Sequence, residues 1–132
     1  MRVIPDGLQL ELTVVAGAQA IPVSPGWHPY FAVAVDAKTR IAGDGATAGS
    51  ITDEREINFG GPPPIDGGSR FTVPALLLEA SPEMRHVHFW TQPGKPFVCI
   101  EPFFGPAGTL NSEARGWVPA GQARTFWMRI TA

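Results

Sequence analysis

Residues 8–15 read Leu-Gln-Leu-Glu-Leu-Thr-Val-Val, so an apolar side chain occupies every second position of the segment. Such alternation is typical of a β-strand that has one face against a core and a wetter opposite face. Residues 124–131 repeat the pattern, with Phe126, Met128 and Ile130 on one face. In the first segment the predicted buried face consists of Leu8, Leu10, Leu12 and Val14. The two segments predict strands and point to an all-β protein.

Further strands are predicted over residues 31–35, 72–79, 85–91 and 96–101. Pro74 makes the second of these an edge strand or a bulged one, because proline cannot donate to a strand ladder. The chain contains 15 glycines and 14 prolines spread along its length, which favours many turns and no helix. Six or seven strands with frequent turns predict an antiparallel β-sandwich or a barrel. Residues 36–70, which include a Gly-Gly-Pro-Pro-Pro run, are predicted to form a long loop.

Composition limits the classes of function. With 132 residues, of which 44% are apolar, the chain is predicted to form one domain over residues 1–132 with a substantial core. The net charge is −2 and there is no run of lysines and arginines, which argues against nucleic acid or an anionic membrane as a partner. No apolar run has the length of a signal peptide core or of a membrane span, so a cytoplasmic location is expected. The single cysteine, Cys99, excludes an intramolecular disulfide and makes a cysteine-based zinc site unexpected.

The first candidate site is a histidine among aromatic residues, in the segment Gly26-Trp27-His28-Pro29-Tyr30-Phe31. Pro29 holds His28 in an extended conformation. The faces of Trp27 and Tyr30 can stack on the C–H face of a pyranose, and an imidazole can exchange a proton near neutral pH. The segment therefore predicts a sugar site, and its alternative interpretation is a structural histidine in an aromatic core.

The second candidate is Glu101, at the end of the apolar segment Pro96-Phe97-Val98-Cys99-Ile100-Glu101. In a strand, Cys99 and Glu101 would share one face, with Val98 and Ile100 on the other. Partial loss of solvent would raise the pKa of the carboxyl group toward the range of a general base. The alternative is a carboxylate at a strand end that projects into water.

Other polar residues have weaker signals. His86 and His88 stand two residues apart, so a strand would direct both to the same side, where they could bind a metal. The carboxylate that completes such a motif in cupins is absent, and a role in packing or at the surface is favoured over a metal. Asp66 lies in a Gly-rich turn, and Cys99 is expected to be a small packed side chain.

Taken in order, these segments resemble the aldose 1-epimerase (galactose mutarotase-like) family. The resemblance rests on two motifs in sequence, His28-Pro29-Tyr30-Phe31 and Cys99-Ile100-Glu101-Pro102. The flanking matches are Pro22, Phe89-Trp90-Thr91 with a Pro-Gly turn, and Pro119-Ala120-Gly121-Gln122 before the last strand. The resemblance implies an antiparallel β-supersandwich with a sugar cleft on its concave face.

The resemblance also implies a reaction, the interconversion of the α and β anomers of an aldohexose. It implies that His28 is the general acid and Glu101 the general base, and it aligns Asp66 loosely with an aspartate that binds sugar hydroxyls. Neither a cofactor nor a metal is expected, because the reaction moves only protons. The expected partner is a monosaccharide.

The match covers nearly all of this chain but only the C-terminal half of the family. The family's N-terminal half supplies further strands, an arginine and a second histidine to the cleft. Half a sandwich would expose sheet edges and an apolar face, which predicts self-association as a homodimer or other oligomer. Two alternatives to the enzyme stay open: a carbohydrate-binding or regulatory module without turnover, and a structural remnant of the fold.

Overall fold

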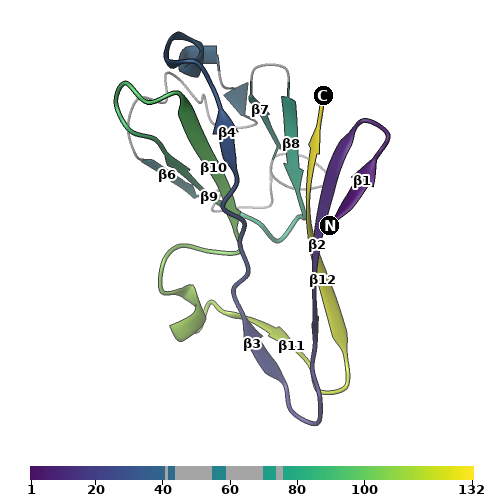
Figure 1. Ribbon diagram of the computed structural model, residues 1–132. Coiled ribbons are helices and arrows are strands. Elements are labelled where there is room, and N and C mark those ends of the chain that lie inside the picture. The colour runs from purple at the N-terminus through teal and green to yellow at the C-terminus, as the bar shows by residue number, and fades with distance from the viewer. Residues whose placement is uncertain (41, 44–54, 59–69, 74–75) are drawn as a thin grey trace.

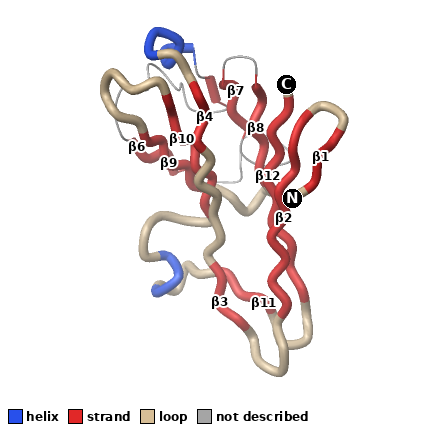
Figure 2. Tube along the Cα trace, viewed as in Figure 1, coloured by secondary structure: helices blue, strands red, loops and turns tan. Residues whose placement is uncertain are grey.

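The structure, a computed structural model, describes residues 1–40, 42–43, 55–58, 70–73 and 76–132. Within these residues the chain forms β-strands and two short 3-10 helices, η1 (Val35–Arg40) and η2 (Thr109–Asn111). All the strand pairs are antiparallel (Figures 1 and 2). The antiparallel all-β fold predicted from the sequence is confirmed. In the described part of the chain, no helix has the length and apolar character needed to span a membrane.

The larger sheet has the strand order β1-β2-β12-β8-β7-β5. Its centre is the pairing of β2 with β12, which joins nine residue pairs near the two ends of the chain. The alternating sequence segments quoted above form these two strands. The strands of this sheet are β1 (Arg2–Ile4), β2 (Gly7–Val15), β12 (Ala123–Thr131), β8 (Leu76–Ala80), β7 (Arg70–Val73) and β5 (Ala42–Gly43).

A four-stranded sheet, with the order β4-β10-β9-β6, lies beside the larger one (Figure 1). A two-stranded sheet of β11 and β3 lies toward the end of the molecule at which β2 ends and β12 begins. The strands of these two sheets are β4 (Tyr30–Ala32), β10 (Phe97–Phe103), β9 (His86–Trp90), β6 (Arg55–Asn58), β11 (Gly116–Val118) and β3 (Ile21–Val23).

The main core lies between the six-stranded and the four-stranded sheet. It combines Leu78 and Met128 from the larger sheet with Phe89, Val98 and Ile100 from the smaller one, and all five are buried. A second cluster joins the larger sheet to the two-stranded sheet through Phe126, Val23 and Val118, among others. Two packed layers are the arrangement expected when each sheet has one apolar face.

Strand β2 departs from the simple alternation predicted for it. Gln9, predicted on the wetter face, is 7% exposed, whereas Leu12, predicted to be buried, is 41% exposed. The buried amide of Gln9 is satisfied at both ends: Arg129, directly opposite on β12, donates to its oxygen at 3.1 Å, and its nitrogen donates to Glu11 at 2.6 Å. Leu12 packs into neither core cluster.

Three predicted segments also differ from the structure. Residues 72–79 were predicted to form one strand, but β7 and β8 are two strands of a hairpin, in which Val73 pairs with Leu76. The predicted strand over residues 31–35 ends earlier, because Val35 begins η1 and is half exposed. Residues 36–70 are not all loop, since they contain β5 and β6, and β6 pairs with β9.

A glycine attaches the loop that carries His28 to strand β10. Gly26 forms a β-bridge with Phe103, and the backbone N–H of Trp27 donates to the carbonyl of Pro102 at 3.0 Å. The ring of Phe103 occupies the space that a Cβ atom at Gly26 would need. The absence of a side chain at Gly26 is therefore what allows this loop to lie against the end of β10.

We expect Gly26→Ala to destabilise the protein by about 1–3 kcal/mol, because the added methyl group must displace an aromatic ring in a packed site. Gly17→Ala is the matched control, since no atom lies within 4 Å of a Cβ built there. That control should change the free energy of unfolding by less than about 1 kcal/mol. Urea denaturation of the two variants measures both values, and equal stabilities would contradict this account of the loop.

Candidate active site

Strand β10 positions the glutamate that the sequence singled out. Val98 and Ile100 point into the main core, so alternation directs Cys99 and Glu101 to the opposite face of the sheet. The predicted sharing of one face by Cys99 and Glu101 is confirmed. Both side chains are buried on that face, with Glu101 4% exposed and Cys99 fully buried.

Cross-strand pairing adds two histidines to the same face. Glu101 lies directly opposite His88 of β9, and Phe103 lies opposite His86. Side chains of directly opposed residues in an antiparallel pair project from one face of the sheet. The prediction that His86 and His88 point to the same side is therefore confirmed, and the side is that of Glu101.

The loop between β3 and β4 brings His28 to Glu101. The Nε2 atom of His28 lies 3.1 Å from the Oε1 atom of Glu101, and half of the His28 side chain is exposed. The two atoms are within ion-pair distance without the alignment of a hydrogen bond. The residues predicted as acid and base, which are separated by more than seventy positions in the sequence, are thus in direct contact.

Aromatic rings hold the imidazole of His28. Tyr30 stacks on it with ring centroids 5.1 Å apart and an angle of 17° between the planes. Trp90 meets the same imidazole edge-on at 6.3 Å, and Phe97 contacts both Tyr30 and Trp90. Trp90 was not predicted as a site residue, although its place opposite Cys99 follows once the β9–β10 register is known.

The other two predicted substrate contacts have different outcomes. Trp27 is largely buried and packs against both core clusters, so its ring joins the His28 loop to the interior. Its contact with a sugar stays a prediction. Asp66 lies outside the described residues.

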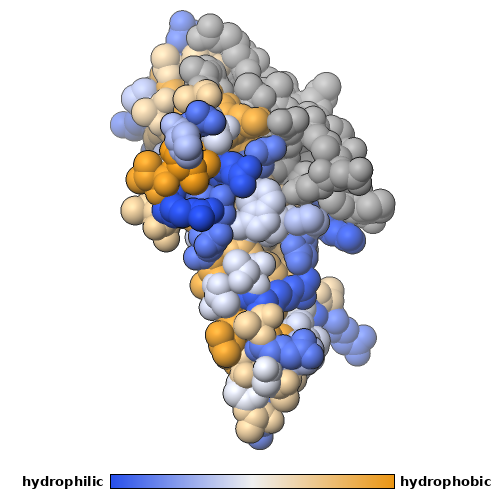
Figure 3. Space-filling model, turned by 90° about the vertical axis from the view of Figure 1, so that its right-hand side faces the viewer, coloured by the Kyte–Doolittle hydropathy of each residue, from blue (hydrophilic) through white to orange (hydrophobic). Residues whose placement is uncertain are grey.

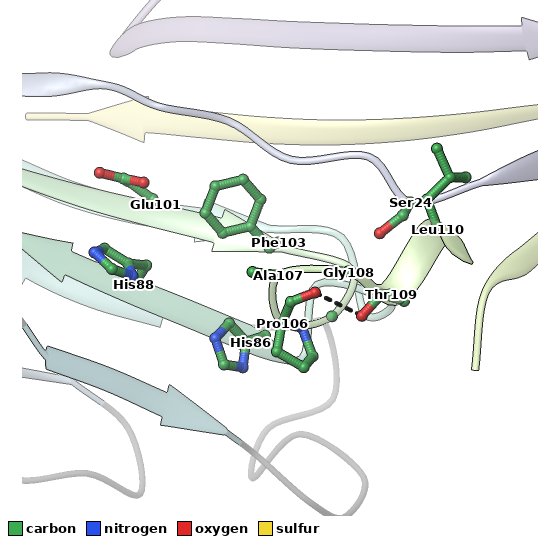
Figure 4. Close-up of a pocket in the computed structure, with 11 residues that line it drawn as sticks. Ser24, His86, His88, Glu101, Phe103, Pro106, Ala107, Gly108, Thr109 and Leu110 are labelled. Carbon is green, nitrogen blue, oxygen red and sulfur yellow. Dashed lines mark hydrogen bonds between the residues drawn. The ribbon is translucent and has the colours of Figure 1, made fainter. Parts of the chain in front are cut away.

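A cavity of about 590 Å³ adjoins Glu101 (Figure 4). Glu101, Phe103, His86 and His88 line it from the neighbouring strands β10 and β9, and Ser24 contributes from the loop after β3. The loop after β10 forms the rest of the wall with Gly105, Pro106, Ala107, Gly108, Thr109 and Leu110. The sequence offered no signal for this loop, which folds back through a hydrogen bond of 2.7 Å from the Thr109 hydroxyl to the Pro106 carbonyl.

The buried pair of Cys99 and Glu101 sets the local electrostatics. The pKa of the Cys99 thiol is raised from its ordinary 9.0 to about 11, chiefly by burial and secondly by the charge of the nearby Glu101 carboxylate. The pKa of Tyr30 is also raised, by loss of solvent and then by the charges of Cys99 and Glu101. A hydrogen bond between Tyr30 and Cys99 opposes the change at the thiol. Near neutral pH the thiol is protonated and unreactive.

Solved structures share this fold. The Slr1438 protein from Synechocystis sp. PCC 6803 matches 98% of this chain with 25% identity and a TM-score of 0.70, and the match spans 51% of that protein. A galactose mutarotase-like protein from Clostridium acetobutylicum matches 95% of the chain with 15% identity and a TM-score of 0.66, over 52% of its length. A provisional aldose 1-epimerase from Escherichia coli K12 matches 96% with 20% identity and a TM-score of 0.61, over 56% of its length.

The resemblance to aldose 1-epimerase and galactose mutarotase-like proteins is therefore confirmed at the level of the fold. The chain spans about half the length of the structures it matches, consistent with the predicted match to half of the family. Comparison with protein-family models and with curated proteins finds no significant match.

The pKa of the Cys99 thiol tests directly the effects of burial and of the Glu101 charge on this site. Glu101→Gln should lower the Cys99 pKa from about 11 toward 9.0, because it removes a nearby negative charge, but not fully, because burial remains the larger cause. The pKa of Cys99 in the folded protein exceeds that of the free thiol. The protonated thiol's contribution to the free energy of unfolding is therefore complete below about pH 9 and is lost as the pH rises to about 11. Thiolate absorbance followed against pH measures the shift. A wild-type thiol that ionises near 9.0 would contradict the described environment.

Proposed function

We propose that this chain interconverts the α and β anomers of an aldohexose, with His28 as general acid and Glu101 as general base. The observation that carries the proposal is the 3.1 Å contact between His28 and Glu101, of which Glu101 lines the cavity. A half-exposed imidazole and a buried carboxylate form a pair in which one group can hold a proton while the other accepts one.

The reaction needs an acid and a base that are close neighbours. In a pyranose the ring oxygen and the anomeric hydroxyl are bonded to the same carbon, so the groups that serve them must lie side by side. Glu101 removes the proton of the anomeric hydroxyl while protonated His28 donates to the ring oxygen, and the bond between the ring oxygen and that carbon breaks. The open-chain aldehyde then turns about its first carbon–carbon bond and closes on the other face. On closure, the hydroxyl that was formed from the ring oxygen gives its proton back to His28 as it attacks the aldehyde carbon. Glu101 gives its proton to the aldehyde oxygen, which becomes the new anomeric hydroxyl.

The surroundings of the pair suit a sugar. Tyr30 is 61% exposed and stacks beside His28, where its ring can pack on the C–H face of a pyranose. The cavity falls within the range of about 300–1,000 Å³ that is typical of small-molecule sites. We assign Trp27 and Asp66 to further contacts with the sugar, in line with the family resemblance.

His88 adds an imidazole to this site. It lies opposite Glu101 on the neighbouring strand and lines the cavity (Figure 4). The resembled family draws a second histidine from its other half. In the proposed site His88 takes that place and hydrogen-bonds a sugar hydroxyl, which would orient the ring relative to Glu101.

A carbohydrate-binding module without turnover is the second candidate function. The observation that favours it is length, because the chain spans about half of the structures it matches and so supplies part of the cleft that the resemblance implies. Such a module would bind an aldohexose in calorimetry and leave the rate of anomer exchange at the rate of buffer.

Self-association is a further part of the proposal. Large apolar side chains such as Val15 and Trp117 are exposed, and Figure 3 shows apolar residues interspersed with polar ones on one face. A second copy that packs on such residues would remove them from water. Light scattering after size-exclusion chromatography should give the mass of a dimer or larger oligomer, and a monomer at all concentrations would remove this part.

Glu101→Gln should lower the rate of mutarotation about 10²- to 10⁴-fold, because it removes a general base and keeps the shape of the side chain. Polarimetry on freshly dissolved α-glucose and α-galactose measures the rate. The matched control is Glu11→Gln, which makes the same change on β2 of the other sheet and should match the wild type. Equal rates for the wild type and Glu101→Gln would refute the assigned mechanism.

A further inference from the structure

The acid–base pair belongs to a larger cluster of possible metal ligands. Among the described residues, one group of three such side chains is formed by His28, Cys99 and Glu101. It offers an imidazole nitrogen, a sulfur and a carboxylate oxygen, all within 4.8 Å of one another. Two of the three residues are buried, on the same face of β10.

The distances are close to those that zinc requires. Zinc binds sulfur at about 2.3 Å and nitrogen or oxygen at about 2.0–2.2 Å, which places tetrahedral ligands roughly 3.3–3.8 Å apart. His28 and Glu101 are already 3.1 Å apart, and the widest separation in the cluster is at most 4.8 Å. Cys99 and Glu101 are fixed on a central strand, whereas His28 is half exposed on a loop. The imidazole of His28 is therefore the ligand that is freest to adjust its position to a metal ion held by the two strand residues.

Charge and orientation also favour a divalent cation. Coordination removes the thiol proton, so a thiolate and a carboxylate would together offset a charge of two. Tyr30 lies directly opposite Cys99 on β4 and stacks on His28, so one ring flanks two of the three ligands from outside the cluster. Mixed nitrogen, sulfur and oxygen ligands suit zinc, and three protein ligands leave a fourth position for water.

We propose that His28, Cys99 and Glu101 form a zinc-binding site whose fourth ligand is solvent on the exposed side of His28. The single cysteine made a zinc site unexpected from the sequence. The number of cysteines does not report which other ligands the fold places beside Cys99. The site uses the atoms that the proposed mutarotase mechanism uses, so a bound zinc ion would occupy the acid and the base at once. The binding itself does not depend on the mutarotase proposal.

Cobalt(II) is the probe, because it replaces zinc and reports its ligands by absorption. Titration of the purified full chain with Co²⁺ should give visible bands of tetrahedral intensity and a near-ultraviolet band from thiolate to cobalt, saturating at one ion per chain. Zinc added afterwards should abolish both. Cys99→Ser should lose the thiolate band, and Glu101→Gln should weaken binding at least about 10-fold, since even a group that only orients a ligand is worth that much.

The controls separate this site from the histidine pair on β9. His88→Gln should leave the thiolate band and the affinity for Co²⁺ unchanged, and thermal unfolding should confirm that Cys99→Ser remains folded. Failure of the wild type to bind Co²⁺, a spectrum that survives Cys99→Ser, or binding lost only in His88→Gln would each overturn the proposal. Because the readout is a spectrum rather than turnover, its failure and that of the mutarotase mechanism are separate results.

Discussion

The antiparallel register of β10 between β9 and β4 is the constraint on which the site depends. It places His88 opposite Glu101 and Tyr30 opposite Cys99, while the alternate residues of β10 close the main core. A shift of one residue would turn Glu101 into that core and expose Ile100. The apolar residues that stabilise the sandwich therefore also fix the direction of the acidic group. The bridge between Gly26 and Phe103 then brings His28 to it.

Much of the sheet could be predicted, because alternation reports the burial of a strand directly. Strands β2, β9, β10 and β12 all lie where the pattern placed them, within a few residues. The short strands β1, β3 and β11 have three residues each, which is too few for a period to show. Buried Gln9 could not be foreseen, because Arg129, which donates a hydrogen bond to its amide oxygen, stands at the other end of the chain.

The candidate site could also be predicted only in part. His28 and Glu101 were found through motifs, but their contact depends on the tertiary structure, which the motifs do not report. The cavity wall formed by the loop after β10, and the role of Trp90 beside His28, required the register of the strands. The same contact gives the site two chemical possibilities, proton transfer to a sugar and zinc binding through Cys99, which exclude each other at any one moment.

In the proposed mechanism, His28 and Glu101 act as one unit on a bound sugar. A double-mutant cycle tests it most directly, with anomer exchange of glucose measured by magnetisation-transfer NMR for His28→Asn, Glu101→Gln and the double variant. Residues that act in one step are strongly non-additive, so the double variant should be no slower than the slower single variant. Losses that multiply in the double variant, or a wild-type rate equal to that of buffer, would contradict the account.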